Sequence, residues 1–460
     1  MNATTTQSRK AAVVILAAGK GTRMKSNLPK VLHKIGNAPM LHHAMRTAEA
    51  LSPDRIVVVV GHGADAVKAA AQAVAPDVRI AVQEQQNGTG HAVLAAQPEL
   101  ADFDGDLFVL FGDTPFIHPD SLLRMKAERD VSDIVALGFH TDTPAGYGRF
   151  IMGDQDHLLE IVESRDLQPH HGSPKTCNSG LKAGDCQTVL HLLGKATPQN
   201  AQGEIYLTDL IKLGTDDGLT CRAVFCDEAE TLGINDRVQL AGAEAIFQTA
   251  ARRDAMLGGA TLTAPETVFF SMDTVLGQDV IVGPNVVFGP GVKVGDGCII
   301  KAFCHLEQTT MAERAEIGPF ARARGGTELA AGVKIGNFVE MKNAQLGPGT
   351  KAGHLSYLGD AVLGSGVNIG AGTITCNYDG VSKHKTTIGD DAFIGVNTAL
   401  VAPVDVADKG FTATGTVVTK NVPADTMAIG RANQENKKPG SASRYLDNKR
   451  SEAEAERETK

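Results

Sequence analysis

The chain has 460 residues, which predicts two large domains or about three of average size. With 42% hydrophobic and 21% charged residues, the composition is that of a soluble globular protein. The sequence contains no run of 18 apolar residues, so we expect neither a transmembrane helix nor a membrane partner. The net charge of −9, with no basic block in the folded part, argues against nucleic acid as a partner.

The cysteines and the N-terminus indicate the compartment. The seven cysteines are scattered and form no CxxC pair, which argues against a disulfide framework and against a zinc knuckle. Residues 1–10 are polar and contain no apolar stretch of the kind found in secretory signals. We therefore expect a cytoplasmic protein.

The first 230 residues alternate strand and helix patterns. Apolar runs predict buried strands, and stretches of helical spacing lie between them. The expected strands are 12–17, 55–60, 79–83 and 106–111, and the expected helices are 40–51, 64–75 and 91–96. This alternation predicts an α/β fold with a mostly parallel, Rossmann-like sheet, whose ligands bind at the carboxyl ends of the strands.

From about residue 263 to 430 the pattern changes to all-β. An apolar or small residue recurs every six positions, as in the tetrads VKVG (292–295), VKIG (333–336) and VNIG (367–370). A six-residue period predicts a parallel β-helix, in which three hexads make one coil. The inward position must be small because three faces converge on the axis. The series run through Val280, Val286, Val292, Cys298 and Cys304, and restart at Ala315, Ala361 and Ala392.

Three segments lie outside these two patterns. Residues 236–258 are alanine-rich with helical spacing and predict a linker helix, and the polar residues 379–386 predict a protruding loop. After Arg431 the chain is dominated by charged and polar residues, which predicts a mostly disordered tail. The expected boundaries are 1–235, 236–258, 259–431 and 432–460.

A glycine-rich turn follows the first strand. It reads Leu16-Ala-Ala-Gly-Lys-Gly-Thr-Arg-Met24 and is followed by Pro29-Lys30. It is neither a Walker A loop nor GxGxxG, because no glycine stands at the third glycine position of that pattern. Its N–H groups can cradle phosphates, which Lys20, Arg23 and Lys30 can neutralise. The glycines alone leave open a plain strand-to-helix turn with surface cations.

The pattern from Leu16 to Lys30 resembles the signature of sugar-nucleotide pyrophosphorylases, which are nucleotidyltransferases acting on sugar 1-phosphates. The resemblance implies that Arg23 and Lys30 stabilise phosphates, that Asp113 and Asn235 bind Mg²⁺, and that UTP is the nucleotide substrate. It implies these UTP- and UDP-sugar-binding residues: Leu16, Ala17, Ala18, Gly19, Lys30, Gln83, Gly88, Thr89, Phe111, Gly112, Gly148, Glu163, Asn178 and Asn235. The chemistry is positioning and charge neutralisation, and one or two protein oxygens suffice for Mg²⁺.

Polar groups interrupt the hexads between residues 318 and 380. Arg324 and Lys342 can hold a sugar phosphate, and Tyr357 and Asn368 can bind hydroxyl groups. His354 suits a general base, because an amino sugar must lose a proton as it attacks a thioester and imidazole titrates in the right range. A single histidine can equally be an exposed turn residue, but its polar neighbours in consecutive coils favour the base.

Together, the halves resemble the family of bifunctional bacterial N-acetylglucosamine-1-phosphate uridyltransferases / glucosamine-1-phosphate N-acetyltransferases, over about residues 11–431. The family resemblance implies a left-handed β-helix, acetyl-CoA-dependent acetylation of glucosamine 1-phosphate, and Mg²⁺-dependent uridylyl transfer from UTP to N-acetylglucosamine 1-phosphate. It also implies a homotrimer with acetyl-CoA sites between subunits, the loop 379–386 reaching a neighbour. The implied acetyl-CoA-binding residues are Ala371, Asn377, Tyr378, Val396, Thr414 and Arg431.

Three positions depart from the family pattern. Gly325 stands where an Arg-Pro-Gly turn is usual, and Val396 and Thr414 stand where Ser and Ala are usual, so we expect an effect on coenzyme affinity. Two alternatives remain: a pyrophosphorylase with a non-catalytic, trimerising β-helix, and a trimeric scaffold with a degenerate head. The segment HLSYLGD (354–360) argues against the first, and LAAGKGTRM (16–24) argues against the second.

Overall fold

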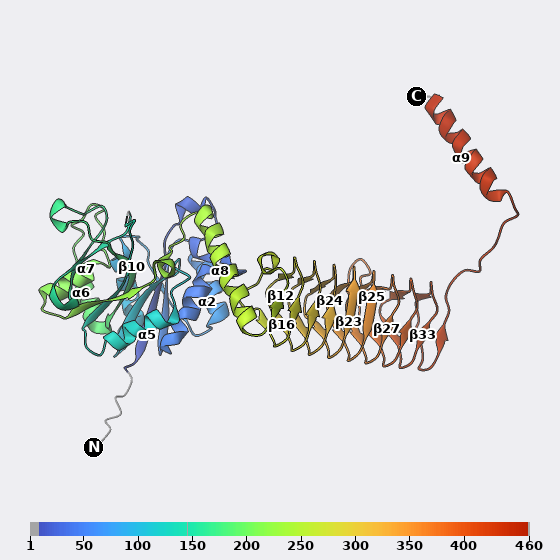
Figure 1. Ribbon diagram of the computed structural model, residues 1–460, viewed down its shortest axis with the longest axis horizontal. Helices are drawn as coiled ribbons and strands as arrows, with labels where there is room; N and C mark the ends of the chain where they lie inside the picture. Colours follow the sequence, from blue (N-terminus) through green and yellow to red (C-terminus); the bar gives the residue numbers. More distant parts are fainter. Residues whose placement is uncertain (1–8, 145, 459–460) are drawn as a thin grey trace, which may run out of the picture. The chain divides into compact units, whose positions relative to one another are not determined.

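The computed structural model describes residues 9–144 and 146–458. The chain forms two compact units (Figure 1). The first comprises residues 1–254 with 270–272, and the second comprises 255–269 with 273–460. In the described ranges no helix is long and apolar enough to cross a membrane.

The first unit is built on a mixed sheet. The parallel strands predicted from the sequence are present, but β10 runs antiparallel between β6 and β7, and a hairpin of β8 and β9 pairs with it. The order is β11 (Cys221–Cys226), β7 (Ile134–His140), β10 (Thr176–Asp185), β6 (Asp106–Phe111), β1 (Ala11–Ala17), β4 (Arg55–Val60), β5 (Arg79–Val82), with β8 (Arg149–Met152) and β9 (Leu158–Val162) beside β10.

Helices cover both faces of this sheet. Every residue of β1 is buried, and alternate residues belong to two different hydrophobic clusters, as the two-residue period of a strand requires. One cluster takes in α1 (Met40–Ala48), α2 (Ala64–Val74) and α5 (Pro119–Glu128). The other takes in α3 (Thr89–Ala95), α4 (Gln97–Leu100), α6 (Cys186–Lys195) and α7 (Asp209–Asp216). The remaining short elements of this unit are β2 (Lys34–Ile35), β3 (Ala38–Pro39) and the 3₁₀ turns η1 (Thr22–Met24), η2 (Lys30–Leu32), η3 (Glu49–Leu51), η4 (Asp154–Asp156), η5 (Pro169–His171) and η6 (Glu228–Thr231). The 3₁₀ turn η7 (Pro265–Thr267) belongs to the second unit.

The helix predicted between the halves is α8 (Arg237–Leu257), and most of it belongs to the first unit. Ala243 packs with Ile35 and Met40, and Gln248 exchanges hydrogen bonds of 2.7 and 2.8 Å with the backbone of Phe270. The first compact unit therefore extends to Asp254, beyond the boundary at 235 expected from the sequence, because α8 supplies part of its core.

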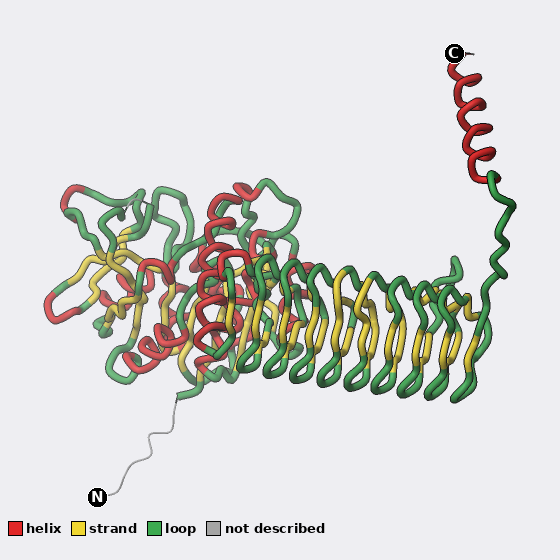
Figure 2. The backbone as a smooth tube through the Cα atoms, turned by 45° about the vertical axis from the view of Figure 1, so that its right-hand side comes forward, coloured by secondary structure: helices red, strands yellow, loops and turns green. Residues whose placement is uncertain are grey.

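The second unit is a left-handed parallel β-helix with three faces, in which short strands alternate with turns (Figure 2). One face comprises β12 (Thr261–Leu262), β14 (Ile281–Val282), β17 (Ile299–Ile300), β20 (Glu316–Ile317), β23 (Lys334–Asn337), β25 (Lys351–His354), β27 (Asn368–Ile369), β30 (Phe393–Ile394), β33 (Phe411–Thr412) and β35 (Met427–Ala428). The second comprises β13 (Val275–Leu276), β16 (Val292–Val294), β19 (Thr309–Met311), β22 (Thr327–Leu329), β29 (Thr386–Ile388) and β32 (Val404–Val406). The third comprises β15 (Val287–Phe288), β18 (His305–Leu306), β21 (Arg322–Arg324), β28 (Ile374–Cys376), β31 (Ala399–Val401) and β34 (Val417–Val418). The longer strands β24 (Glu340–Leu346) and β26 (Tyr357–Leu363) contribute to both the second and the third faces.

The hexad positions predicted from the sequence point inward. Val280, Val286, Val292, Cys298 and Cys304 are all at most 1% exposed. Paired strands are 17 or 18 residues apart from Ile281 to Asn368, but Asn368 pairs with Phe393, 25 residues later. The longer coil contains the loop that the sequence predicted at 379–386.

The tail is the expectation that was wrong. Residues 441–458 form a helix, α9 (Ser441–Glu458), instead of the mostly disordered segment expected. Its composition explains the difference, because Ala, Glu, Arg and Lys have high helix propensity. Ion pairs one turn apart, Lys449–Glu452 and Arg450–Asp447, add support without any buried core.

Candidate active sites

The glycine-rich turn opens on a cavity of about 320 Å³ in the first unit, beside the carboxyl ends of β1, β5 and β6. The cavity is where parallel strands are expected to hold a ligand. Its predicted lining residues are Leu16, Ala17, Ala18, Gly19, Lys30, Gln83, Gly88, Thr89, Phe111 and Asp113. It is also lined by Val31, Gln86, Ala92 and Glu204, which sequence reasoning missed.

The turn can close over Lys30 only because of a glycine. Gly21 has φ +58°, and a Cβ there would lie 2.6 Å from the Cβ of Lys30. Arg23 is exposed in η1 and does not line the cavity. Gly112 also lies outside the lining, with its N–H donated to the carbonyl of Leu16 at 3.0 Å.

Two predicted metal ligands meet at one cation. Lys30 Nζ donates to Asp113 Oδ2 and, at 3.1 Å, to Asn235 Oδ1. A backbone hydrogen bond of 3.1 Å from Ile234 to Asp113 holds these distant segments together. A carboxylate and an amide oxygen that converge on a single cation fit Mg²⁺, which takes one or two protein oxygens with the rest from phosphate and water. The described residues contain no cluster of three or more His, Cys, Asp or Glu side chains for a metal.

The other predicted sugar-phosphate residues form a separate group. The backbone carbonyl of Gly148 accepts a hydrogen bond of 2.9 Å from the backbone N–H of Asn178, and a Cβ at Gly148 would lie 3.5 Å from Glu163 Oε2. Gly148, Glu163 and Asn178 do not line the 320 Å³ cavity. Asn235 does not line it either, but accepts a hydrogen bond from Lys30, which does.

The chain segment at 204–208 borders both groups. Leu207 N–H donates to Thr89 Oγ1 at 3.0 Å, and Thr208 Oγ1 donates to Glu163 Oε1 at 3.2 Å. Sequence reasoning missed this segment because it carries no glycine or charge motif.

In the second unit one corner of the β-helix carries a column of predicted residues. Asn337 pairs in register with His354. The registers of the following coils place Ala371, Val396 and Thr414 at the same corner. Backbone bonds of 2.7 Å from Asn397 to Ala371 and 2.8 Å from Gly415 to Val396 join these coils, and Arg431 donates to the Thr414 carbonyl at 2.7 Å. We call this set, from Asn337 to Arg431, the corner column.

His354 stands in this column with a partner that selects the tautomer of its neutral ring. Its Nδ1 lies 2.8 Å from Asn337 Oδ1. An amide oxygen only accepts hydrogen bonds, so the neutral ring carries its proton on Nδ1 and leaves the Nε2 lone pair free. The sequence predicted His354 but missed Asn337, which lies 17 residues earlier.

A cationic group lies on neighbouring coils. Arg324 and Lys342 are in register, and Glu340 accepts a hydrogen bond of 2.9 Å from Arg324 Nε. Lys383, from the inserted loop, together with Arg324 lowers the pKa of Lys342. Like charges held this close provide a site for an anion. Sequence reasoning missed Lys383.

Tyr357 and Asn368, predicted to bind hydroxyl groups, lie on different faces. Tyr357 is in register with Glu340, and its hydroxyl lies over Gly359, where a Cβ would be 2.4 Å away. Asn368 is in register with Lys351, on the face that carries His354.

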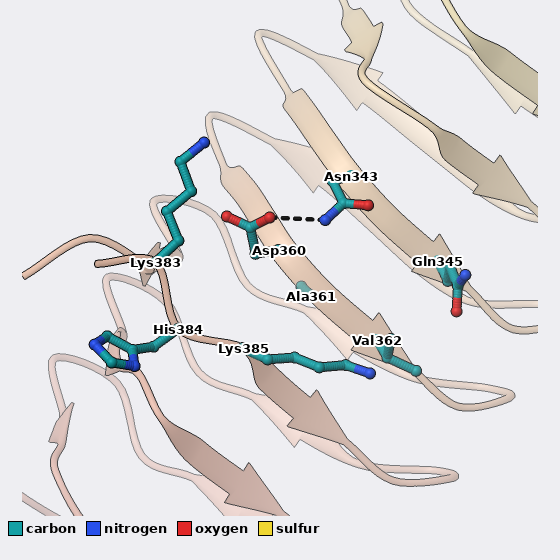
Figure 3. A pocket seen from close by; sticks show the side chains of 8 residues that line it. All are labelled: Asn343, Gln345, Asp360, Ala361, Val362, Lys383, His384 and Lys385. Carbon is teal, nitrogen blue, oxygen red and sulfur yellow. Dashed lines mark hydrogen bonds between the residues drawn. The ribbon is translucent and has the colours of Figure 1, made fainter. Parts of the chain in front are cut away.

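A hollow of about 270 Å³ beside the inserted loop contains none of the predicted substrate-binding residues (Figure 3). Asn343 donates to Asp360 at 2.8 Å, and Lys383 extends alongside Asp360 while His384 points away (Figure 3). Burial raises the pKa of Asp360, but hydrogen bonds from Asn343 and Asn377 and the nearby lysine charges outweigh it, so its pKa lies below the usual value. Asp360 is therefore a charged anchor between coils.

Two predicted acetyl-CoA-binding residues lie away from the corner column. Asn377 donates to Asp360 Oδ2 at 2.5 Å, and the Tyr378 hydroxyl donates to the Gly380 carbonyl at 2.6 Å. The structure of one chain therefore brings Ala371, Val396, Thr414 and Arg431 together but not Asn377 and Tyr378.

Comparison with known proteins agrees with this two-part organisation. The family model of the MobA-like NTP transferase domain matches residues 13–173, and that of the bacterial transferase hexapeptide (six repeats) matches residues 273–308. The fold and sites thus define a bifunctional transferase, with a nucleotidyltransferase domain followed by a hexapeptide-repeat domain.

Full-length relatives identify the family. The chain is 53% identical to the Bifunctional protein GlmU of Ruegeria sp. (strain TM1040), covering 95% of this chain and 97% of that one. It is 57% identical to the Bifunctional protein GlmU of Ruegeria pomeroyi, covering 93% and 94%, and 49% identical to that of Paracoccus denitrificans, covering 95% and 97%. The chain belongs to the GlmU family.

Proposed function

We propose that the chain makes UDP-N-acetylglucosamine in two steps at two separate sites. The β-helix acetylates glucosamine 1-phosphate with acetyl-CoA, and the N-terminal unit transfers a uridylyl group from UTP to the product. Two alternatives are an enzyme with both activities and an enzyme with uridylyl transfer alone. The hydrogen bond of 2.8 Å between Asn337 and His354 is the observation that favours the bifunctional enzyme. A β-helix that served only as a scaffold would have no use for an oriented imidazole or for a group of cations on its coils.

Acetyl transfer follows from the second-unit site. Arg324, Lys342 and Lys383 hold the phosphate, and Tyr357 and Asn368 bind sugar hydroxyl groups. His354 Nε2 takes the proton from the amine as its nitrogen attacks the thioester carbonyl. The new N–C bond replaces the C–S bond, and the thiolate of coenzyme A leaves and takes up a proton. The coenzyme lies along the corner column, from Ala371 to Arg431.

Uridylyl transfer follows from the first-unit cavity. Gln83, Gly88 and Thr89 hold the base, Gly148, Glu163 and Asn178 hold the sugar phosphate, and Lys30 with Arg23 neutralises the triphosphate. A phosphate oxygen of the sugar phosphate attacks the α-phosphorus and pyrophosphate leaves; no protein base is needed because the nucleophile is already ionised. Asp113 and Asn235 would hold Mg²⁺, which would withdraw charge from the phosphates when bound.

We further propose a homotrimer with acetyltransferase sites between subunits, working in the cytoplasm. The position of Asn377 and Tyr378 away from the corner column supports an intersubunit site, because a second chain can supply them. All seven cysteines are free, which supports a reducing compartment.

Mass spectrometry of one mixture tests the proposal. The protein is incubated with glucosamine 1-phosphate, acetyl-CoA, UTP and Mg²⁺, and we expect a UDP-N-acetylglucosamine peak. N-acetylglucosamine 1-phosphate alone would contradict the uridylyl step. An unacetylated amino sugar would reduce the β-helix to a scaffold.

A further inference from the structure

A buried lysine lies next to the sugar-phosphate residues. Lys182 is in β10, between β6 and β7, and is 1% exposed. Its Nζ donates to Asn178 Oδ1 at 2.7 Å and to the carbonyls of Gly180 and Leu181 at 3.2 and 3.3 Å. None of these three acceptors is a carboxylate, so the hydrogen bonds satisfy the donors of the amine without neutralising its charge.

A break in strand pairing creates this arrangement. The register between β10 and β7 shifts between Asn178 and Lys182. Gly180, inside the break, has φ +100°, and a Cβ there would lie 2.7 Å from the ring of Phe111. The bulge therefore needs glycine. It turns Lys182 back toward Asn178, which is four residues earlier on the same strand.

The contacts fix which way the Asn178 amide points. Its Oδ1 accepts from Lys182 Nζ at 2.7 Å and from the Gly180 N–H at 2.9 Å. With two donors on the oxygen, the opposite rotamer would bring the Asn178 –NH₂ group against them. The –NH₂ end is thus reserved for an acceptor oxygen. The Cβ of Asn178 and Oε2 of Glu163 both lie 3.5 Å from where a Cβ on Gly148 would stand, so the three residues are neighbours.

We propose that Lys182 is a positioning residue for sugar-phosphate binding: it holds Asn178 so that its amide –NH₂ donates to an oxygen of N-acetylglucosamine 1-phosphate. The inference rests on the proposed uridylyl transfer and assigns a role to a residue outside the predicted site. Burial lowers the pKa of the Lys182 amine to about 7, although the charge of Glu163 acts in the opposite direction. This lowered pKa shows that burying the charged amine costs free energy. Such perturbed groups concentrate at functional sites.

Steady-state kinetics of the full-length enzyme test the role, with N-acetylglucosamine 1-phosphate varied at saturating UTP. We expect Lys182→Met to raise KM for the sugar phosphate about tenfold, the equivalent of one lost hydrogen bond, with kcat changed less than about twofold. Lys182→Gln keeps a donor within reach of Asn178 and is expected to retain a KM within about threefold of the wild-type value.

A double variant separates positioning from bulk stability. If Lys182 acts through Asn178, the Lys182→Met/Asn178→Ala enzyme has the KM of Asn178→Ala alone, because the interaction is already lost. Additive effects, or lowered stability with an unchanged KM in both Lys182 variants, would overturn the inference. Acetyl transfer, measured in the same samples, reports that the second unit is intact, and a kcat for uridylyl transfer within about twofold of the wild-type value reports that the first unit, which contains Lys182, is folded. Failure of the wild-type enzyme to transfer uridylyl groups would instead refute the proposed function.

Discussion

At the scale of single residues, the candidate sites are made of pairs rather than isolated side chains. Asn337 orients the ring of His354, the proposed base, and Asp113 and Asn235, the proposed Mg²⁺ ligands, both direct an oxygen at Lys30 Nζ. The two pairs belong to different units, so their losses are expected to be independent.

Substitution of one member of each pair is expected to separate the activities. His354→Ala removes the base and should lower acetylation at least about a hundredfold while sparing uridylyl transfer. Asp113→Ala should do the reverse. Separate assays of the two steps check this, with Asn337→Ala expected to weaken only acetylation. If either His354→Ala or Asp113→Ala lost both activities while still folded and assembled, the two-site assignment would be wrong.

Lys182 also predicts how stability depends on pH. Its pKa is about 7 in the folded state, against about 10.4 for an ordinary lysine, so between these values the unfolded state binds more protons. The unfolding free energy is therefore expected to rise with pH across this window, by up to about 1.4 kcal/mol per pH unit, relative to Lys182→Met. Urea unfolding of the wild-type protein and of Lys182→Met at pH 7, 8 and 9 measures the difference between their unfolding free energies. The titration of the buried cysteines contributes equally to both proteins and therefore cancels in this difference. A pH-independent difference would contradict the prediction.

At the scale of elements, the side chains of the candidate sites are positioned by short irregular segments, namely turns, a bulge and a loop, which are themselves attached to regular strands. The turn through Gly21 lies against Lys30, the bulge at Gly180 turns Lys182 back, and the inserted loop brings Lys383 to Lys342. This loop is closed by its own contacts, including His384 Nε2 to Asp379 Oδ2 at 2.7 Å.

Gly21→Ala tests the glycine turn. The added methyl group would meet the Lys30 Cβ at 2.6 Å in a left-handed backbone conformation, which costs about 1–2 kcal/mol for a residue with a side chain. We expect the turn and Lys30 to shift, with uridylyl transfer reduced at least about tenfold and acetylation unchanged. Gly242→Ala in α8, where nothing lies within 4 Å of the added carbon, is the matched control and should leave both activities intact. Equal activities in the two variants would contradict this role of the turn.

At the scale of the whole molecule, the proposed trimer makes the acetyltransferase a shared property of neighbouring chains. If Tyr378 of one subunit completes the site containing His354 of another, neither single variant is active alone. Mixed assemblies of His354→Ala and Tyr378→Ala chains would contain some sites with both residues intact.

Co-expression of the two variants is therefore expected to restore acetylation to about a quarter of the wild-type value, as random mixing gives. Sedimentation should first show a particle of three times the chain mass of 48.3 kDa. Mixed trimers that remain inactive would indicate that both residues act within one chain.

Local patterns of the sequence were enough to predict part of this protein. The hexad series predicted the β-helix because the inward position repeats along the chain itself, and Val280 to Cys304 are buried as expected. The buried strands and the turn through Gly21 were predictable for the same reason. The tail was not, because high charge suggests disorder even where local propensity forms α9.

What the sequence by itself determined was the architecture of the two units and the residue types their chemistry needs, since periodicity and turn composition act between near neighbours. Only the tertiary structure decided which of those residues meet: Lys30 with Asn235, 205 positions away, His354 with Asn337, and Lys383 with Lys342. The mixed sheet and the bulge in β10 decided the place of Lys182. These contacts depend on how distant strands and coils align in register, and no local pattern in the sequence encodes that alignment.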